Sequence, residues 1–409
     1  MEEDILRTIT RIAAITVAAG LSTHANAQKN YGPGVTDTEI KIGQTMPYSG
    51  PASSLAMFGR VPLAYFKKVN AEGGINGRKV NLISLDDAFS PPKTVEQVRK
   101  LVESDEVLAI MGSVGTPTGL ATAKYLNAKK VPQLFLTSGS PKLEDPKGLP
   151  WTTTFYASQL VEARIYAEYL LKSRPDAKLA VLYQNDDLGK GYLSGIKIGL
   201  GAKATTMIVK ETGYEITEPT IDSQILTLKA SGADTLFIAG TPKFAAQAIR
   251  KAHETNWKVQ HVLMSGVSQI SSTLRPAGLE ASTGAVTSIW HKQPGDPDWA
   301  DDKDMRDYQA FLKEWAPGEQ TDDSTSAFAY TIAQMMVEVL KRCGDDLTRE
   351  NVLKQATNVK GLQLPLMVPG VRVNISPDNR VAWRQGRMAR FDGSRWVFFG
   401  DIITVSADP

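Results

Sequence analysis

Hydroxyl and glycine residues recur in this sequence where short apolar stretches end. Ser49 follows IKIGQTMPY, Thr116 follows AIMGSVG, Ser138 to Ser140 follow QLFLT, Thr241 follows TLFIAG, and Ser265 follows VLM. In parallel α/β sheets the carboxyl ends of the strands face the crevice that holds a ligand. Hydroxyls and backbone N–H groups at the start of a helix suit a carboxylate. The pattern therefore predicts a site for a small anion.

The segment GSVGTPTG, residues 112–119, also raises the possibility of phosphate binding, because glycines before a helix expose N–H groups at the positive end of its dipole. It lacks the Lys-Ser/Thr ending of a P-loop and the G-x-G-x-x-G spacing of a dinucleotide site. We therefore expect no nucleotide and no cofactor. A carboxylate needs fewer donors, such as the hydroxyl of Thr116 and one or two N–H groups. A purely structural strand-to-helix turn with capping hydroxyls fits the same residues.

Nucleophilic and metal chemistry have little support in the sequence. Ser113 in MGSVG and Ser138 in LTSGS do not match the G-x-S-x-G elbow of hydrolases. No pair of histidines has ligand spacing on a helix, and Cys343 is the single cysteine, so we predict neither a metal site nor a disulfide. Cys343 is expected to be a buried small residue near a helix end. We predict a protein that is not an enzyme, with an α/β hydrolase as the alternative.

The overall charge and the N-terminal segment lead to two separate predictions. Lysine and arginine total 46 against 44 acidic residues, with no basic run interleaved with aromatics, so a nucleic-acid partner is not expected. Arg7 and Arg11 precede the apolar IAAITVAAGL, and Ala25-Asn26-Ala27 fits a signal-peptidase site. We predict a signal peptide over residues 1–27, cleaved before Gln28, and a periplasmic protein. An amphipathic N-terminal helix is the alternative, since MEED is unusually acidic for a signal start.

Two successive series of strands and helices must position the hydroxyls. Strands are expected over 39–50, 80–87, 106–112 and 131–140, and again over 178–186, 205–212, 234–240 and 259–266. Two βαβ series predict two parallel sheets covered by helices. Pro62 is expected in the first turn of the first helix, and Thr94 with Gln97 is expected to form the capping box of the second. A long helix over 324–344 and a β-hairpin over 379–400 complete the chain.

Four segments carry a resemblance to a known family: IKIGQTMPYSGP, VNAEGGINGRKVNLISLDD, IMGSVGTPTG and AVLYQNDDLGKGY. Together with the signal peptide they resemble the periplasmic substrate-binding proteins of branched-chain amino-acid-type ABC transporters, the Leu/Ile/Val-binding protein family. The likeness runs from about Val35 to Val373. It implies the α/β, type I periplasmic binding protein fold, in which each of two lobes is a parallel sheet flanked by helices and three chain segments form the hinge.

The resemblance also implies approximate lobe boundaries. Lobe 1 is expected over residues 28–156 plus 289–366, and lobe 2 over residues 157–288 plus 367–409. The three hinge segments are expected near Phe155, near Ser288, and between Leu364 and Asn374.

Ligand-binding residues follow from the same resemblance. In the amino-acid binders of the family, hydroxyls and backbone groups at the ends of the third and fourth strands meet the ligand carboxylate, and Thr116, Gly139 and Ser140 resemble those positions. Phe58 resembles the aromatic residue that covers the ligand. Tyr156 is a further predicted ligand contact.

The second lobe departs from the family pattern. Ser265 stands where the family has an acidic residue for the ammonium, and Leu188 and Thr241 stand where it has two tyrosines. Because a buried ammonium without a carboxylate partner is strongly disfavoured, we favour a small organic acid, including an aromatic one, over leucine or valine. Tyr48 and Phe155 are further candidates to enclose it. Branched-chain amino acids stay the alternative, with the missing charge supplied by Asp186, Asp187 or Glu218.

The expected partners complete the resemblance. It implies a monomer that delivers its small carboxylate ligand to the membrane permease of an ABC transporter, without metal or cofactor. A protein that presents ligand to a membrane chemoreceptor shares the fold and is a further alternative.

Overall fold

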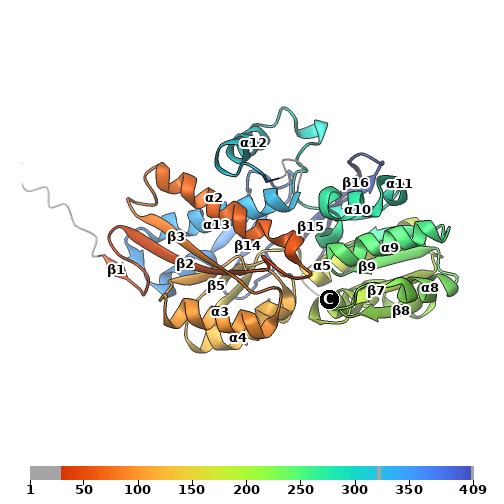
Figure 1. Cartoon of the computed structure of the whole chain (residues 1–409), viewed down its shortest axis with the longest axis horizontal. Helices are drawn as coiled ribbons and strands as arrows, with labels where there is room; N and C mark the ends of the chain where they lie inside the picture. The colour runs from red at the N-terminus through yellow and green to blue at the C-terminus, as the bar shows by residue number, and fades with distance from the viewer. Residues whose placement is uncertain (1–28, 320–323, 407–409) are drawn as a thin grey trace, which may run out of the picture.

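The computed structural model describes residues 29–319 and 324–406, in which the chain forms two α/β bodies that lie side by side (Figure 1). The predicted signal peptide and its cleavage before Gln28 fall outside these residues. No helix within the described ranges is both long and apolar enough to cross a membrane.

The first body contains a parallel five-stranded sheet in the order β3-β2-β4-β5-β6. Its helices cover both faces, α2 on one side and α3 and α4 on the other (Figure 1). The elements are β2 (Glu39–Met46), α2 (Met57–Ala71), β3 (Lys79–Asp86), α3 (Pro91–Glu103), β4 (Ala109–Met111), α4 (Thr116–Ala128), β5 (Gln133–Leu136) and β6 (Thr152–Thr154).

The second body contains a seven-stranded sheet in the order β16-β15-β11-β10-β9-β7-β8. Five strands are parallel, and the C-terminal hairpin adds two antiparallel strands at one edge. Its main elements are α5 (Gln159–Ser173), β7 (Leu179–Gln184), α6 (Asp187–Leu200), β8 (Ile208–Tyr214), α8 (Asp222–Ala230), β9 (Thr235–Ala239), α9 (Pro242–Glu254), β10 (Gln260–Leu263), β11 (Val286–Ile289), β15 (Gln385–Phe391) and β16 (Trp396–Thr404), with short helices α7 (Ala204–Met207), α10 (Arg275–Ala277) and α11 (Leu279–Ser282).

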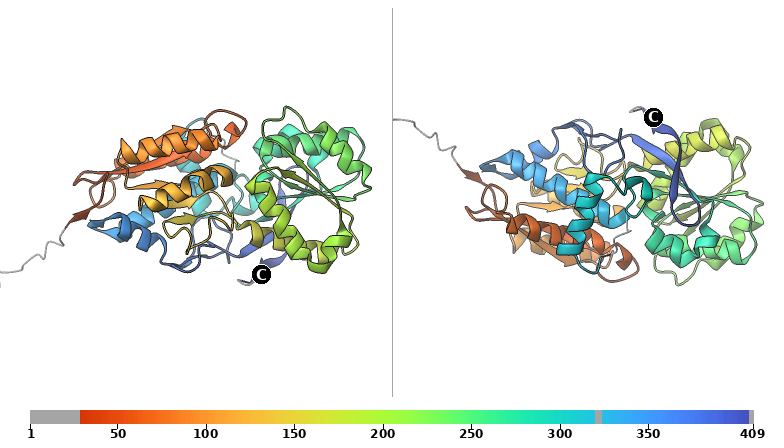
Figure 2. Two further views of the ribbon diagram at one scale, coloured as in Figure 1. Left: turned by 90° about the horizontal axis from the view of Figure 1, so that it is seen from below. Right: turned by 90° about the horizontal axis from the view of Figure 1, so that it is seen from above.

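Late segments of the chain return to the first body. Helices α12 (Lys303–Trp315) and α13 (Ser324–Cys343) pack on α2, while the terminal strands lie on the second body (Figure 2). The remaining elements are β1 (Asn30–Tyr31), β12 (Asp346–Leu347), α14 (Arg349–Ala356), β13 (Val359–Leu362) and β14 (Val373–Ile375). The predicted α/β fold, the long helix and the terminal hairpin are thus confirmed.

The chain passes between the two bodies three times, and aromatic rings join these passages. Phe155 follows β6, Trp290 follows β11, and Trp383 precedes β15. Ring centroids of Phe155 and Trp383 lie 5.3 Å apart, and those of Trp290 and Trp383 lie 4.7 Å apart. Phe328 of α13 stacks on Phe155 at 5.8 Å. The passages are therefore held together by one aromatic cluster, while the lobe boundaries given above stay predictions.

Two predicted helix starts are wrong. Pro62 lies in the second turn of α2, because this helix already begins at Met57. Proline has no N–H to give to the carbonyl four residues earlier. That carbonyl belongs to Phe58, and it accepts instead from the side-chain amide of Gln44 at 3.2 Å. This substitute bond lets the helix continue through Pro62.

Thr94 is not the cap of α3, because Pro91 and Pro92 begin the helix and Ser90 precedes it. Proline is favoured in the first helical turn, where its missing N–H has no intrahelical partner to lose. The hydroxyl of Thr94 donates to Asp87 at 3.0 Å. The predicted capping box with Gln97 is therefore replaced by a link between α3 and the end of β3.

Cys343 has the predicted setting. It is the last residue of α13 and is buried. Burial raises the pKa of its thiol to about 12. The thiol is therefore protonated at neutral pH and unreactive.

Candidate functional site

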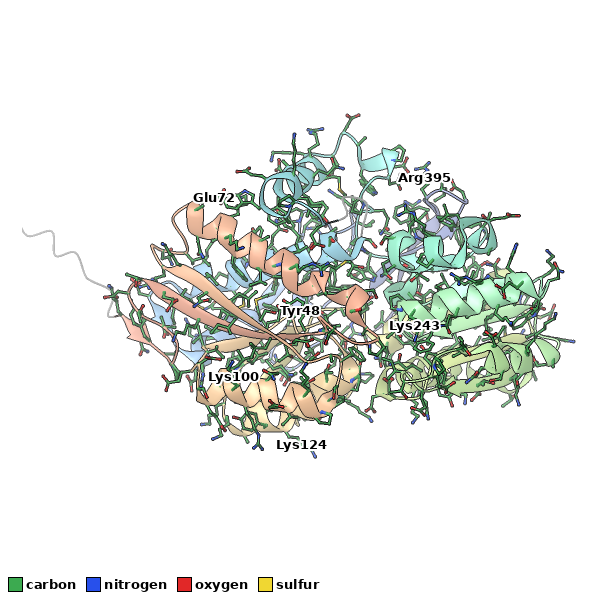
Figure 3. The ribbon with its side chains drawn as sticks, viewed as in Figure 1. Tyr48, Glu72, Lys100, Lys124, Lys243 and Arg395 are labelled. Atoms are coloured by element: carbon green, nitrogen blue, oxygen red, sulfur yellow. The ribbon has the colours of Figure 1, made fainter. Side chains whose placement is uncertain are left out.

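A cavity with about 600 Å³ of empty volume lies where the strand ends of the two bodies face each other. Several helices begin at its wall: Thr116 starts α4, Gln159 starts α5, Leu188 is the second residue of α6, and Pro242 starts α9. Figure 3 labels Lys243 at this end of α9, which faces the first body. Among the described residues that line the cavity there is no Asp, Glu, Lys, Arg or His. Its field therefore comes from helix N-termini and hydroxyl dipoles.

The wall from the first body is centred on two hydroxyls. Thr116 Oγ1 and Ser138 Oγ lie 2.7 Å apart, so one proton joins them. Thr116 Oγ1 also accepts from the amide nitrogen of Gln159 at 3.2 Å, and Ser138 Oγ accepts from the backbone N–H of Ser140 at 3.3 Å. Two hydroxyls own two protons, and their mutual bond uses one. The second proton is available for an acceptor in the cavity.

Gly139 lies beside this pair because the two bodies come into backbone contact there. Its carbonyl accepts from the N–H of Gln159 at 2.7 Å. A Cβ at position 139 would lie 1.9 Å from the carbonyl oxygen of Ala157, which leaves no room for a side chain. Gly139 lines the cavity. Ser140 does not line it, but its backbone N–H donates to the hydroxyl of Ser138, which does. Direct ligand contact by Ser140 stays a prediction.

The wall from the second body holds Leu188 and Thr241, as the sequence led us to expect. Thr241 is the N-cap of α9, and its buried hydroxyl has no hydrogen-bond partner among the described residues. Its backbone N–H donates to Tyr214 at 3.2 Å. Six of the eight predicted residues thus line one cavity, all except Ser140 and Ser265, although their contact with a ligand stays a prediction.

A smaller, narrow chamber adjoins the cavity, with which it shares Phe58, Tyr156 and Gln269. Ser265 lines this chamber, and its hydroxyl lies 3.2 Å from that of Tyr156. Phe58 packs edge to face against Phe328 at 6.1 Å. Ser265 is therefore set back from the main cavity, behind Tyr156.

Behind Tyr156 and Ser265 lies a buried carboxylate that was not predicted from the sequence. Glu162 of α5 is 1% exposed. It accepts hydrogen bonds from the hydroxyls of Tyr166 (2.6 Å), Tyr192 and Ser288 (3.1 Å) and from the N–H of Ser265 (2.8 Å). Burial raises the pKa of Glu162 above its ordinary value, and the bonds from the tyrosines and Ser265 oppose that rise. These four donors compensate the negative charge of Glu162, so this charge is not available to pair with a ligand ammonium.

The acids proposed above as substitutes for the family's acidic residue are engaged elsewhere. Asp186 caps α6 by accepting from the N–H groups of Leu188 and Gly189. Asp187 pairs with Lys142 at 2.5 Å, and Glu218 accepts from the side chain of Gln224 at 2.6 Å. None of the three acids lines the cavity that the described residues form. A ligand ammonium would therefore enter this cavity without a carboxylate partner.

The two aromatic residues proposed for enclosure also lie elsewhere. Tyr48, labelled in Figure 3, belongs to the first body, and its hydroxyl lies 2.6 Å from that of Ser84. Phe155 is part of the aromatic cluster of the three passages. The rings that line the cavity are instead those of Phe58, Phe89, Tyr156 and Tyr192.

Three further residues of the site have little signal in the sequence. Gln159, Tyr192 and Gln269 line the cavity, but they lie inside or next to helices, where a large inward residue is typical of ordinary core. Glu162 and Tyr166 lie four residues apart in α5, a spacing that brings side chains together on one helix face. That spacing is a sequence signal for Glu162, whereas the burial of the pair is visible only in the structure.

Comparison with known proteins gives consistent results. A family described as periplasmic binding protein matches residues 39–395. An amino acid binding protein of Pseudomonas aeruginosa is 22% identical over 335 residues, which cover 81% of this chain and 83% of the relative. Leu/Ile/Val-binding protein homolog 7 of Brucella suis is 24% identical, over 62% of this chain and 63% of the relative.

Solved structures share the fold at low identity. A branched-chain amino acid ABC transporter protein from Thermus thermophilus with bound valine aligns with a TM-score of 0.81 at 16% identity, covering 91% of this chain and 98% of that one. A solute-binding protein of an ABC transporter from Rhodopseudomonas palustris, in complex with 3,4-dihydroxybenzoic acid, aligns with a TM-score of 0.74 at 20% identity, covering 91% and 99%. A fatty acid ABC transporter substrate-binding protein from Thermomonospora curvata aligns at 0.76 and 21%, covering 92% and 95%.

Proposed function

Because the chain belongs to the periplasmic binding protein family, we propose that it is the extracytoplasmic solute-binding component of an ABC importer. It binds a small carboxylate-bearing ligand in the cavity between its two bodies and delivers the ligand to a membrane permease. The two bodies act as the lobes of a clamp that opens and closes about the three passages. It acts as a periplasmic monomer after its signal peptide has been removed before Gln28.

One observation carries the carboxylate proposal: the cavity combines helix N-termini and a spare hydroxyl proton with a lining free of ionised side chains. Thr116 and Ser138 supply the proton, and α4 presents its N-terminus beside them. Gly115, the N-cap of α4, has no side chain to occupy that terminus, whereas Asp186 already occupies the terminus of α6. The ligand carboxylate is therefore expected at the wall from the first body.

The rest of the cavity favours an uncharged ligand body. Apolar surface comes from Phe58, Phe89, Leu188 and Met264. Among the described lining residues, no Asp or Glu is present to pair with an ammonium. An organic acid, aromatic or aliphatic, fits these walls better than a zwitterion. The similar structures have been solved with valine and with 3,4-dihydroxybenzoic acid, and one is described as a fatty acid binder. Binding of a branched-chain amino acid is the second candidate, which the names of the relatives favour.

A thermal-shift screen separates these ligand classes. Aliphatic and aromatic carboxylates are tested beside leucine, isoleucine, valine and neutral amides, and hits are titrated by calorimetry. We expect stabilisation by a simple organic acid, because a ligand at a hundred times its Kd adds about 2.7 kcal/mol to the free energy of unfolding. Stabilisation by leucine, isoleucine or valine at micromolar concentration, with none from the simple acids, would overturn the organic-acid assignment.

Binding without chemistry is part of the same proposal. The ligand should be recovered unchanged after long incubation, and small-angle scattering should show a more compact particle when it is bound. Turnover that disappears on substitution of Ser113 or Ser138 would favour a hydrolase instead. Ligand-dependent binding to a chemoreceptor rather than to a permease would favour the ligand-presenting alternative.

A further inference from the structure

At the cavity wall from the second body, the direction of the hydrogen bond between Tyr192 and Glu162 decides whether the Tyr192 oxygen can donate or only accept. Tyr192, 0% exposed, lines the cavity and donates its phenolic proton to Glu162. A phenol has one proton, so while that proton is given to Glu162 the Tyr192 oxygen can act only as an acceptor toward any other group. The other three bonds to Glu162 come from Tyr166, Ser265 and Ser288 and are also donations. All four bonds run toward Glu162 when its carboxyl is ionised, a state that the four donors favour and that burial opposes.

A second acceptor lies at the same wall. The side-chain nitrogen of Gln269 donates to the carbonyl of Ser265 at 3.1 Å. A carbonyl can only accept, so this bond fixes which end of the amide is nitrogen. The other end, Oε1, is a buried acceptor without a partner among the described residues. Gln269 is 8% exposed and lines both the cavity and the adjoining chamber.

A third acceptor belongs to the chamber. His291 Nε2 lies 3.2 Å from the carbonyl oxygen of Ser324, which again can only accept, so Nε2 carries the ring proton. Burial lowers the pKa of His291 to about 4, so the ring is neutral near pH 7. Its Nδ1 is then an acceptor, and it too is buried without a hydrogen bond among the described residues. Three acceptors, on Tyr192, Gln269 and His291, thus belong to residues that line the cavity or the adjoining chamber.

We propose that Glu162 is a positioning residue for ligand specificity: by taking the proton of Tyr192, it adds an acceptor to this wall that selects ligands carrying a hydrogen-bond donor away from their carboxylate. The inference rests on the proposed function and deepens it. The ligand class is a small acid with a hydroxyl or an uncharged N–H group on its body. An ether or ester oxygen at that place would meet an acceptor and lose affinity.

Three substituted benzoates test the proposal by calorimetry: the hydroxy, methoxy and ethyl compounds, each with the substituent at carbon 3 or carbon 4. Ethyl matches methoxy in size but has no oxygen. For the natural protein we expect the better hydroxybenzoate to bind at least tenfold more tightly than its methoxy analogue, and methoxy to bind no better than ethyl. If the screen yields a different parent acid, the same three substituents are placed on that acid.

Glu162→Gln is the informative variant. Its amide can donate to Tyr192, which frees the phenolic proton to point into the cavity. We expect the methoxy compound to gain at least fivefold relative to the ethyl compound, because only methoxy can accept that proton. A role of Glu162 in packing alone would weaken all three compounds together. Tyr192→Phe, which removes the oxygen, should bring the hydroxy and methoxy affinities within about threefold of each other.

The outcomes separate the inference from the function on which it rests. If simple acids bind but the natural protein does not distinguish hydroxy from methoxy, or if Glu162→Gln leaves the methoxy-to-ethyl ratio unchanged, the inference is wrong and the proposed function stands. If no carboxylate binds, the proposed function fails and the inference fails with it. Thermal melts of both variants show whether each is folded at the titration temperature.

Discussion

The two walls of the cavity achieve polarity by opposite means. The wall from the first body has a spare proton, on the Thr116–Ser138 pair, and the free N-terminus of α4. The wall from the second body keeps the unpartnered hydroxyl of Thr241, but it offers lone pairs at Tyr192, which gives its proton to Glu162, and Asp186 occupies the N-terminus of α6. A ligand that satisfies both walls is an acceptor at one end and a donor at the other. Specificity then needs no charged side chain in the cavity.

The largest expected effect comes from adding a side chain at Gly139, where the backbones of the two bodies touch. Gly139→Ala places a methyl group 1.9 Å from the carbonyl oxygen of Ala157, so the start of α5 must move. We expect a loss of about 2–3 kcal/mol in unfolding free energy and weaker ligand binding. Urea unfolding and calorimetry measure the two effects.

Gly213→Ala is the matched control for this glycine. Its added Cβ would meet the ring of Tyr183 at 3.1 Å, a side chain that can shift, and Gly213 does not line the cavity. We expect a smaller loss of stability and an unchanged affinity. Equal effects of the two substitutions would show that the contact at Gly139 has no special role.

The next effect tests the spare proton. Thr116→Val keeps the size of the side chain but removes one hydroxyl of the Thr116–Ser138 pair, so either the donor to the ligand carboxylate or the partner that orients it is lost. We expect affinity for a simple acid to fall by roughly 1.5–3 kcal/mol, because a bond to a charged group is worth that much. Thr118→Val is the control, since its buried hydroxyl bonds only to backbone carbonyls of the turn before it and does not line the cavity. If both variants bind alike, Thr116 has only a structural role.

The smallest effect, when taken per pH unit, concerns a carboxyl group where the bodies meet. Glu144 accepts from Ser158, the N-cap of α5, at 2.9 Å, and its other oxygen is buried without a hydrogen bond among the described residues. Burial raises the pKa of Glu144 to about 8. The folded state therefore holds a proton that the unfolded state has lost between the ordinary pKa near 4.5 and about pH 8, so stability falls as pH rises through that window.

Glu144→Gln should remove this dependence. We expect the variant to gain about 1 kcal/mol of stability relative to the natural protein between pH 6 and pH 7, close to the limit of 1.4 kcal/mol per pH unit for one group. Urea unfolding at several pH values measures the difference. A constant difference from pH 5 to pH 8 would contradict the raised pKa.

The contrast between the walls also explains what the sequence could predict. Thr116, Gly139 and Thr241 follow strand ends, and parallel sheets bring such ends to one crevice whatever the details of packing. Their position therefore depends on topology, which the alternation of strands and helices reveals. The resemblance to a known family added Phe58 and Leu188, and the expected apolar enclosure added Tyr156; all three line the cavity.

The second wall depended on side-chain directions that a sequence does not reveal. Glu162 and Tyr192 lie within helices, where their inward direction and mutual bond arise from the packing of α5 on α6. Ser265 is set back from the main cavity because Tyr156 stands in front of it. The start of α2 was misplaced for two reasons. Its N-cap is Ala56, which gives no capping signal, and Gln44 of β2 supplies the hydrogen bond to Phe58 that Pro62 cannot make.

The central claim is that the cavity holds an anion through neutral donors, and one affinity ratio tests it most directly. Calorimetry compares the tightest simple acid from the screen with its primary amide, which has the same shape but no charge. A charge-assisted bond and a helix N-terminus predict that the acid binds at least about thirtyfold more tightly. Equal affinities, or tighter binding of the amide, would contradict the account.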